Sequence, residues 1–277
     1  MSVQSISTRP PDTWARGDAY EGNVGRWSRR VASRLIDWLA VSPDSLWLDV
    51  GCGTGALSQT ILQQTAPRGI TSFDRSTGFI GHVRSRVDNP RVRCVVGDAQ
   101  ALPVESATYD AVVSGLMLNF VPQPQQAVNE MARAIRPGGT VGVYVWDYAD
   151  KMQLMRYFWD AAAALDPAAR ALDEGRRFSI CQPPILKDLF QNAGLRDVAV
   201  QAIDIATIFR DFDDYWLPFL GGQGPAASYA VALTDERRVA LRERIRDRLP
   251  FAADGSIPLV ARAWAARGVK ASGAPYE

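Results

Sequence analysis

Short apolar runs alternate along this chain with segments in which apolar residues recur every three or four positions. Near the N-terminus, Trp27, Val31, Leu35 and Leu39 recur at four-residue steps, which predicts an amphipathic helix. The apolar runs have the length of strands, and glycine, serine or an acidic residue follows each of them. These runs cover residues 46–50, 69–73, 92–96, 109–113 and 140–146. Strands separated by helical segments predict a parallel sheet with helices on both faces.

The pattern changes after Trp146. Residues 150–180 carry methionines and aromatic residues at helical spacing, and residues 212–220 form a second aromatic cluster. An apolar cover over a ligand site excludes water and accepts hydrophobic molecules. We therefore expect these two segments to form a cap that lines a substrate cavity.

Further elements are predicted between and after the cap segments. Residues 184–192 are predicted as a helix that Gly194 ends, and residues 198–205 as a strand. A last strand is predicted over residues 256–264. Pro258 is placed at its start because proline cannot donate a hydrogen bond to a central ladder.

The first apolar run contains Asp49 and leads into glycine at every second position of Gly51–Gly55. Glycine lets the backbone adopt positive φ and approach a bound ligand closely. Leu57 and Ile61 follow at helical spacing, so a helix is expected to begin there and to direct its free N–H groups toward the same ligand. The segment predicts a nucleotide-binding loop. Its spacing differs from the dinucleotide fingerprint G-x-G-x-x-G, because Ala56 occupies the position of the last glycine.

Two later strands also end in an acid. Asp74 lies about twenty residues after the glycine loop, where a carboxylate can accept both hydroxyls of a ribose. Asp98 follows the next strand. The carboxyl ends of parallel strands meet at one edge of a sheet, so we expect Asp49, Asp74 and Asp98 to share one hollow there.

The stretch D-V-G-C-G-T-G resembles the first motif of the class I S-adenosylmethionine-dependent methyltransferases, and I-R-P-G-G-T-V-G-V-Y-V-W from Ile135 resembles a later signature of that family. The resemblance implies a Rossmann-like methyltransferase fold. This fold has a seven-stranded, mostly parallel sheet with an antiparallel last strand, helices on both faces and a helical cap insertion. Over residues 45–147 the motifs are most similar to the ubiquinone/menaquinone C-methyltransferase-like branch.

The same resemblance implies S-adenosyl-L-methionine as the cofactor and assigns roles around it. The glycine loop would hold the methionine part, Asp98 and the backbone of Ala99 the adenine, and the carbonyl of Ser114 the ammonium group. Tyr20 and Arg26 would reach the cofactor carboxylate. The cofactor-binding residues expected in this way are Tyr20, Arg26, Asp49, Gly51, Cys52, Gly53, Gly55, Asp74, Arg75, Asp98, Ala99, Ser114 and Met117.

The chain is accordingly expected to divide into three parts. Residues 1–22 have little periodicity and are predicted to be a mobile arm. Residues 23–148 would form the cofactor-binding core. Residues 149–277 would supply the cap and the C-terminal strands that complete the sheet.

Composition limits the partners. The formal net charge is +1, so there is no overall attraction to nucleic acid or to an anionic membrane. Thr234–Leu249 carries six arginines, but acidic residues alternate with them and a buried apolar stripe is expected beneath, so we interpret it as a solvated helix face. We expect a small-molecule acceptor, a possible homodimer and no nucleic-acid partner.

The cysteines and the N-terminal sequence indicate the cellular compartment of the protein. Three widely separated cysteines form neither a disulfide framework nor a metal-ligand set. Neither a signal-peptide pattern nor an apolar stretch long enough to span a membrane is present. The sequence therefore predicts a soluble cytoplasmic protein without a bound metal.

Motifs that the chain lacks exclude some classes of methyl acceptor. Enzymes that methylate base amines carry an acid or amide followed by Pro-Pro-aromatic, whereas this chain has Ser114-Gly115-Leu116-Met117. Enzymes that methylate cytosine carry a cysteine directly after a proline, whereas Cys181 precedes Gln182-Pro183. A small, hydrophobic or aromatic acceptor remains. In-line methyl transfer needs alignment more than a base. The catalytic residues are therefore left open, with Asn119, Asp147 and Tyr148 as candidates for contact with the acceptor.

Two other functions fit part of the pattern. A non-catalytic sensor or scaffold that binds the cofactor or its demethylated product would need the same loop. An NAD(P)-dependent oxidoreductase would use the same crevice, but the missing glycine and the predicted final hairpin disfavour it.

Overall fold

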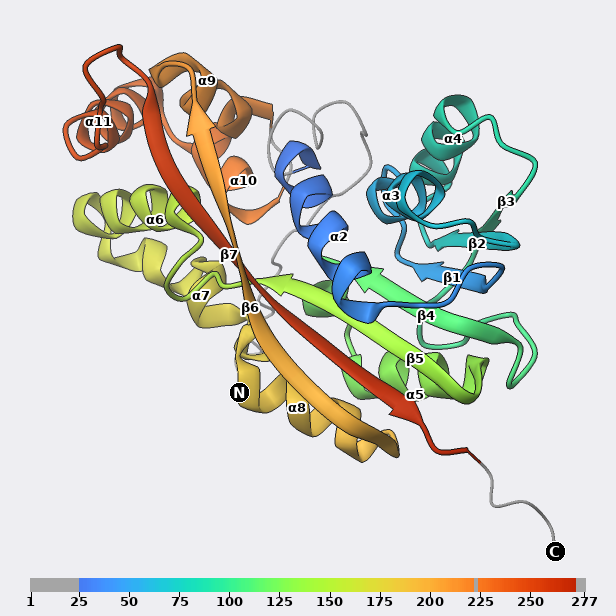
Figure 1. Cartoon of the computed structure of the whole chain (residues 1–277). Helices are drawn as coiled ribbons and strands as arrows, with labels where there is room; N and C mark the ends of the chain where they lie inside the picture. Colours follow the sequence, from blue (N-terminus) through green and yellow to red (C-terminus); the bar gives the residue numbers. More distant parts are fainter. Residues whose placement is uncertain (1–24, 222–223, 273–277) are drawn as a thin grey trace, which may run out of the picture.

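A twisted sheet of seven strands forms the centre of residues 25–221 and 224–272, the part of the chain that this computed structural model describes (Figure 1). Its strands are β1 Leu46–Val50, β2 Gly69–Asp74, β3 Val92–Val96, β4 Tyr109–Gly115, β5 Ile135–Trp146, β6 Leu195–Phe209 and β7 Ile257–Lys270. Their order is β3-β2-β1-β4-β5-β7-β6. Strands β1 to β5 pair in parallel, whereas β7 lies antiparallel between β5 and β6. The predicted Rossmann-like sheet with an antiparallel last strand is confirmed.

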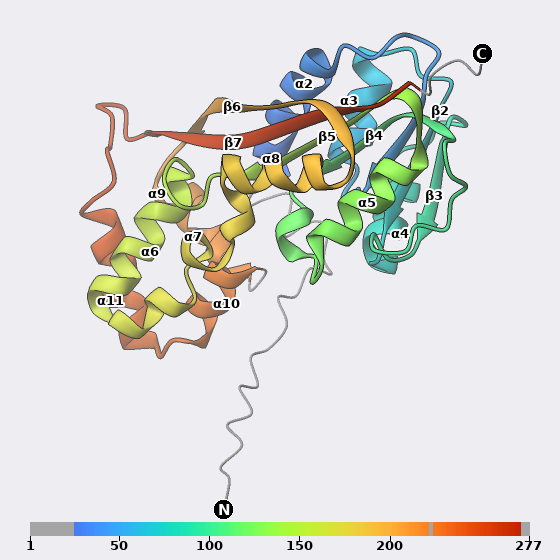
Figure 2. The same ribbon diagram turned by 90° about the horizontal axis from the view of Figure 1, so that it is seen from below.

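Helices cover both faces of this sheet, as Figure 2 shows. On one face lie α2 Arg26–Leu39 and α3 Ala56–Gln64, and on the other lie α5 Pro124–Ala134 and α8 Pro183–Asn192, while α4 Thr77–Arg86 packs against β2 and β3. The apolar face predicted for the helix α2 is buried, because its apolar side chains at four-residue steps all face the sheet. A side chain at Gly142 on β5 would come within 2.6 Å of Leu39 in α2. Glycine there lets the helix lie directly on the strand.

Strands β6 and β7 extend beyond the end of β5 and carry the cap. Only Ala263–Val269 of β7 pairs with β5, whereas the preceding part of β7 pairs with β6 alone. Figures 1 and 2 show the cap helices gathered around this projecting end. They are α6 Gln153–Leu165, η3 Pro167–Ala171, α7 Glu174–Arg177, η4 Ser179–Cys181, α9 Phe212–Trp216, η5 Leu217–Gly221, α10 Pro225–Ala232 and α11 Asp235–Arg246.

The bounds of three strands differ from the prediction. Strand β6 extends past the predicted 198–205 at both ends. Strand β7 continues past the predicted residue 264 to Lys270, because residues 265–269 pair with β5 on one side and with β6 on the other. Pro258 is tolerated near the start of β7, since that part of the strand has no β5 neighbour that needs its missing donor. Strand β5 begins at Ile135, earlier than the predicted residue 140, because Ile135 pairs with Tyr109 directly after α5 ends at Ala134.

Helix α11 has the two-sided character expected of residues 234–249. Leu241, Ile245 and Leu249 are buried. Arg238 forms an ion pair with Asp235, and Arg242 with Asp213 and Glu243. Arg238 and Arg242 are thus paired with acidic groups.

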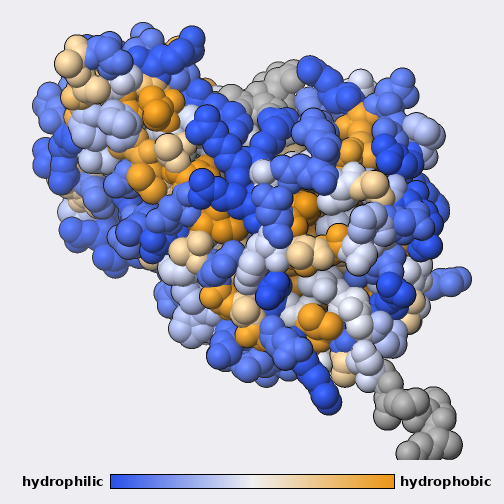
Figure 3. Space-filling view, viewed as in Figure 1, coloured by the Kyte–Doolittle hydropathy of each residue, from blue (hydrophilic) through white to orange (hydrophobic). Residues whose placement is uncertain are grey.

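Apolar side chains on the face of the molecule seen in Figure 3 are interspersed with charged ones. The most exposed apolar side chains of β6 and β7 are Ile208, at 55%, and Val260, at 36%. Asp204 and Arg262 form an ion pair on the same two strands. The Nε and Nη2 of Arg262 donate to the Oδ1 and Oδ2 of Asp204, at 2.6 and 2.8 Å. Charges therefore interrupt the apolar surface of the projecting hairpin.

Within residues 25–221 and 224–272, no helix combines the length and the apolar character needed to cross a bilayer. The predicted mobile arm over residues 1–22, and Tyr20 within it, lie outside the described residues. The division of the chain into core and cap parts at residue 148 stays a prediction.

Candidate functional site

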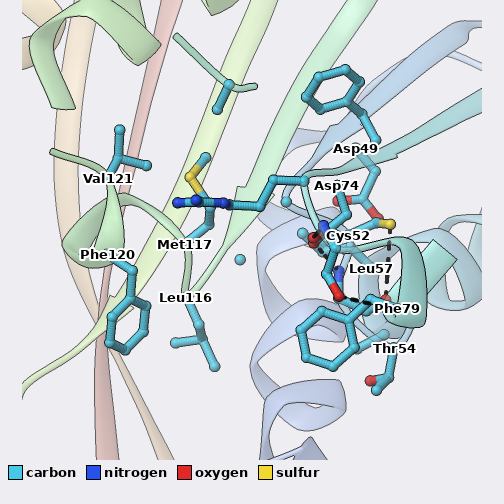
Figure 4. A pocket seen from close by; sticks show the side chains of 18 of the residues that line it. Asp49, Cys52, Thr54, Leu57, Asp74, Phe79, Leu116, Met117, Phe120 and Val121 are labelled. Carbon is cyan, nitrogen blue, oxygen red and sulfur yellow. Dashed lines mark hydrogen bonds between the residues drawn. The ribbon is translucent and has the colours of Figure 1, made fainter. Parts of the chain in front are cut away.

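A cavity of about 540 Å³ lies at the carboxyl ends of the parallel strands (Figure 4). Its volume falls in the range typical of small-molecule sites. Most of the residues predicted to bind a cofactor line it, including Asp49 in β1, Asp74 in β2 and Asp98 in the segment after β3. The predicted residues that line it are Asp49, Gly51, Cys52, Gly53, Asp74, Arg75, Asp98, Ala99, Met117 and Tyr148.

The glycine loop is bent around one end of this cavity. Gly51, Gly53 and Gly55 all have positive φ, at 73°, 51° and 88°. The backbone N–H groups of Gly51 and Cys52 both donate to the carbonyl of Phe73, at 2.7 and 2.9 Å. The loop is therefore attached to the end of β2, and its left-handed conformations require glycine.

Asp49 is fully buried beneath this loop. Its Oδ2 accepts hydrogen bonds from the backbone N–H of Ser58, at 3.0 Å, and from the Ser58 hydroxyl, at 2.6 Å. Its Oδ1 is buried and has no hydrogen-bond partner among the described residues. Burial raises the pKa of this carboxyl from 3.8 to about 7. A buried carboxylate with an unused oxygen fits a cationic ligand, because a nearby positive charge would favour its ionised form.

Asp74, at the end of β2, is hydrogen-bonded to the glycine loop. Its Oδ2 accepts from the N–H of Gly53 at 3.0 Å, and its Oδ1 from the N–H of Ser76 at 2.8 Å. Burial raises the pKa of this carboxyl above its ordinary value, against the effect of these hydrogen bonds. Each oxygen retains lone-pair capacity for a ligand hydroxyl.

Replacing Asp74 by asparagine is expected to weaken binding of S-adenosylmethionine by about 10- to 100-fold, because hydrogen bonds to a charged acceptor are lost. Isothermal titration of the two proteins measures this difference. Asp88→Asn is the comparison variant, since Asp88 is exposed and does not belong to the described cavity lining. Equal affinity in the wild-type protein and Asp74→Asn would exclude the ribose role.

The structure does not bring all predicted residues to the cavity. Arg26 instead forms an ion pair with Asp214 at 3.0 Å and lies over the rings of Trp27 and Phe209, at 4.6 and 4.9 Å. Its predicted contact with a cofactor carboxylate would require this ion pair to open. Gly55 and Ser114 are likewise absent from the described lining, although their neighbours Thr54, Ala56 and Gly115 belong to it.

Two of the three candidate acceptor contacts also lie outside the cavity lining. Asp147 is buried, and its carboxylate accepts from the N–H groups of Asp150 and Lys151 at 3.2 and 3.3 Å, so it stabilises the turn after β5. Asn119 is buried in η2 Leu118–Phe120, and its amide has no partner within the described part of the chain. Tyr148 does line the cavity.

At the other end of the cavity only Tyr148 was predicted from the sequence, and the segments 150–180 and 212–220, which were expected to line a substrate cavity, are absent from the described lining. The wall of this end combines apolar and aromatic side chains with two hydroxyls, and the Oγ of Ser28 lies 2.7 Å from the phenolic oxygen of Tyr144. Tyr144 and Trp146 are two residues apart on β5 and therefore face the same side, a signal that strand periodicity could have supplied. The residues of this acceptor end are Ser28, Phe120, Val121, Pro122, Tyr144, Trp146 and Tyr148.

The described residues contain no group of histidine, cysteine and acidic side chains that could hold a metal ion. Cys52 lines the cavity, and burial together with the nearby Asp49 raises the pKa of its thiol well above the ordinary value. A thiol with a raised pKa is a poor nucleophile. The site therefore resembles a ligand-binding cradle more than a centre of covalent catalysis.

Comparisons with known proteins agree with this geometry. A family model described as "Methyltransferase domain" matches residues 48–143. The chain is 35% identical over 147 residues to a ubiquinone/menaquinone biosynthesis C-methyltransferase of Cereibacter sphaeroides, which covers 51% of this chain and 57% of that protein. It is 34% identical over 113 residues to the protein of the same name in Ruegeria sp., covering 39% and 45%. The matches thus span about half the length of these relatives.

Solved structures share the fold at low sequence identity. Phosphoethanolamine N-methyltransferase 2 of Haemonchus contortus, in complex with S-adenosyl-L-methionine, has a TM-score of 0.60 at 15% identity, covering 92% of this chain and 56% of that one. YcgJ of Bacillus subtilis has a TM-score of 0.57 at 17% identity, covering 88% and 100%. The cyclase SpnF has a TM-score of 0.54 at 17% identity, covering 96% and 89%.

The buried Asp49, the positive-φ glycine loop and the ring-lined end of one cavity all fit an adenosyl sulfonium ligand. Fold, family match and site point to the same group of proteins. Residues 48–143 match a methyltransferase domain, and the described residues have the Rossmann-like fold of solved methyltransferases.

Proposed function

We propose that this protein transfers the methyl group of S-adenosylmethionine to a small, hydrophobic or aromatic molecule. The observation that carries the proposal is the continuity of one cavity, from the glycine loop to the aromatic side chains of Phe120, Tyr144, Trp146 and Tyr148. An acceptor bound at that end would lie next to the methionine part of the cofactor.

The names of relatives support the same acceptor class. Besides the ubiquinone/menaquinone biosynthesis enzymes, a 2-phytyl-1,4-naphtoquinone methyltransferase of Thermosynechococcus vestitus is 26% identical over 174 residues, covering 59% of this chain and 77% of that protein. All of these names refer to quinones. A fused-ring aromatic acceptor is therefore a reasonable first choice for assays.

The bound cofactor would supply an electrophilic methyl group, and the protein would contribute alignment and exclusion of water. Asp49 would hold the cationic cofactor from the floor of the loop, because its buried carboxylate has an unused oxygen. Phe120, Tyr148 and Trp146 would hold the acceptor in an apolar environment. Of the candidate acceptor contacts, Tyr148 is the best placed to orient an acceptor oxygen, since it lines the cavity.

The proposal also includes the cellular location, the kind of partner and the oligomeric state. A cytoplasmic location fits the three free cysteines, since thiols persist in reducing compartments. The near-zero net charge supports a neutral small molecule in preference to nucleic acid. A homodimer is included in the proposal because closed dimers are the commonest oligomers.

The test has two stages. Isothermal titration is expected to show that the full-length protein binds S-adenosylmethionine and, separately, S-adenosylhomocysteine. Incubation with S-adenosylmethionine and a panel of naphthols, naphthoquinols and simple phenols is then expected to yield S-adenosylhomocysteine and a methylated product, detected by mass spectrometry. Asp49→Asn serves as the inactive comparison.

The outcomes separate the alternatives. Cofactor binding without turnover on any member of the panel would favour the non-catalytic sensor or scaffold. Fluorescence enhancement of NADH on mixing would favour the oxidoreductase. Absence of cofactor binding in folded protein would contradict the proposal altogether.

A further inference from the structure

Phe178 lies directly behind two aromatic walls of the acceptor end. Its ring centroid is 5.3 Å from that of Phe120, in a T-shaped contact, and 5.8 Å from that of Tyr148, in a tilted one. Both of those residues line the cavity, whereas Phe178 does not belong to the described lining. The position of two cavity walls thus depends on a third ring that a ligand does not reach.

The backbone at Phe178 is fixed by the short helical turns on either side of it. Its N–H donates to the carbonyl of Glu174 in α7, at 2.9 Å, and its carbonyl accepts from the N–H of Cys181 in η4, at 3.0 Å. The guanidinium of Arg177 lies 5.0 Å from the centre of the Phe178 ring. The ring is therefore held at a junction between two turns and is not part of a loose loop.

Helix α7 is in turn attached to α6 by two buried acidic side chains. The carboxylate of Asp173 accepts two hydrogen bonds from the guanidinium of Arg156, at 2.6 and 3.1 Å, in the bidentate geometry that fixes orientation. The carboxyl of Glu174 accepts from the indole N–H of Trp159. Asp173 and Glu174 are only 7% and 2% exposed. These contacts join the turn that carries Phe178 to the cap core.

The same turn also lies closely against the end of β5. A side chain at Gly175 would come within 2.7 Å of the Tyr148 carbonyl oxygen and within 2.9 Å of Arg156. Only glycine allows this approach, because a backbone carbonyl cannot move aside as the end of a side chain can. The backbone of Tyr148 and the ring of Tyr148 are therefore both in contact with the Gly175–Phe178 turn.

We propose that Phe178 is a specificity-determining residue, which sets the width of the acceptor end by supporting Phe120 and Tyr148 from behind. It acts through those two rings and is a positioning residue. The inference rests on the proposed function, since it concerns the acceptor end of that site. Removing the ring lets Phe120 and Tyr148 retreat, so that the cavity accepts wider molecules, and a larger ring does the opposite.

The test compares two fluorescent aromatic alcohols of different width, 2-naphthol and 1-hydroxypyrene, titrated into full-length protein saturated with S-adenosylhomocysteine. Phe178→Ala is expected to shift the ratio of the two dissociation constants about tenfold in favour of 1-hydroxypyrene, the discrimination that a small change in pocket size typically gives. Phe178→Trp is expected to shift the ratio toward 2-naphthol. Affinity for S-adenosylhomocysteine should stay within about twofold in both variants, since neither change touches the glycine loop.

Phe219→Ala is the matched control. Phe219 is a buried cap aromatic that packs on Phe158, Tyr215 and Trp216, none of which lines the cavity. The Phe219→Ala substitution should lower thermal stability without changing the ratio of the two dissociation constants. A ratio unchanged in both Phe178 variants, or changed equally by Phe219→Ala, would overturn the inference while leaving the cofactor site intact. Failure of the wild-type protein to bind S-adenosylhomocysteine would instead contradict the proposed function.

Discussion

Replacing Asp49 by asparagine is expected to weaken binding of S-adenosylmethionine by about a hundredfold and yet to make the ligand-free protein more stable at pH 8. The loss of affinity follows because a buried carboxylate would no longer face the cationic cofactor, and such pairs typically contribute several kcal/mol. The gain in stability follows because the wild-type protein must ionise a fully buried carboxyl at that pH. Asparagine can still accept from Ser58 with its amide oxygen.

The raised pKa of Asp49 determines how the stability difference between the two proteins depends on pH. In the folded protein the pKa of Asp49 is raised from 3.8 to about 7, so the folded state binds this proton more tightly than the unfolded state. The resulting stabilisation is present below pH 3.8 and is lost as the pH rises through about 7, with a total change on the order of 4 kcal/mol. Asp49→Asn should therefore gain most over the wild type above pH 7 and lose this advantage under acidic conditions.

Thermal unfolding of both ligand-free proteins between pH 5 and pH 8 measures the stability difference, and titration calorimetry over the same range measures affinity. Wild-type affinity for S-adenosylmethionine should rise with pH, because the cation favours the ionised carboxylate, whereas that of the variant should stay flat. A variant that is less stable than wild type at pH 8, or that binds the cofactor normally, would contradict the assignment of Asp49.

Replacing Gly51 by alanine is expected to destabilise the protein by about 3 kcal/mol and to weaken cofactor binding more than tenfold. Two costs add up. Alanine at a φ of 73° has an unfavourable left-handed backbone, at about 1 kcal/mol. The new Cβ would also lie 2.4 Å from Cγ and 2.6 Å from Cβ of Met117, atoms too close to the backbone to swing away, at about 1–3 kcal/mol.

Gly194→Ala separates these two costs. Gly194 has a similar φ of 75°, but nothing lies within 4 Å of a Cβ placed there, and the residue is not part of the described cavity lining. Denaturant unfolding should show a loss of about 1 kcal/mol for this control with unchanged cofactor affinity. Equal destabilisation by the two substitutions would mean that Met117 does not constrain the loop.

The cofactor half of the site could be predicted from the sequence because local patterns determine it. A strand with Asp49 near its end, a loop with alternate glycines and a second strand that ends at Asp74 place their side chains at one sheet edge in any parallel arrangement. Asp49, Asp74 and Asp98 indeed share one cavity. The prediction needed only the order of elements along the chain.

The acceptor half could not be predicted in the same way, because it depends on contacts between distant segments. Ser28 in α2 meets Tyr144 in β5 across 116 positions of the chain. Asp147, predicted to contact an acceptor, is instead occupied by the turn that follows it. Arg26 has a partner 188 positions away in Asp214. A strand-end polar residue has several possible partners, and only packing decides among them.

The length of β6 and β7 has a consequence for dynamics. Because these two continuous strands belong to the central sheet at one end and support the cap at the other, no flexible linker separates the two regions. Hinge rotation of the cap as a rigid body would have to bend a hydrogen-bonded ladder. Cap and sheet are therefore expected to move as one body, so that local motions of the cap are confined to its short helices and side chains.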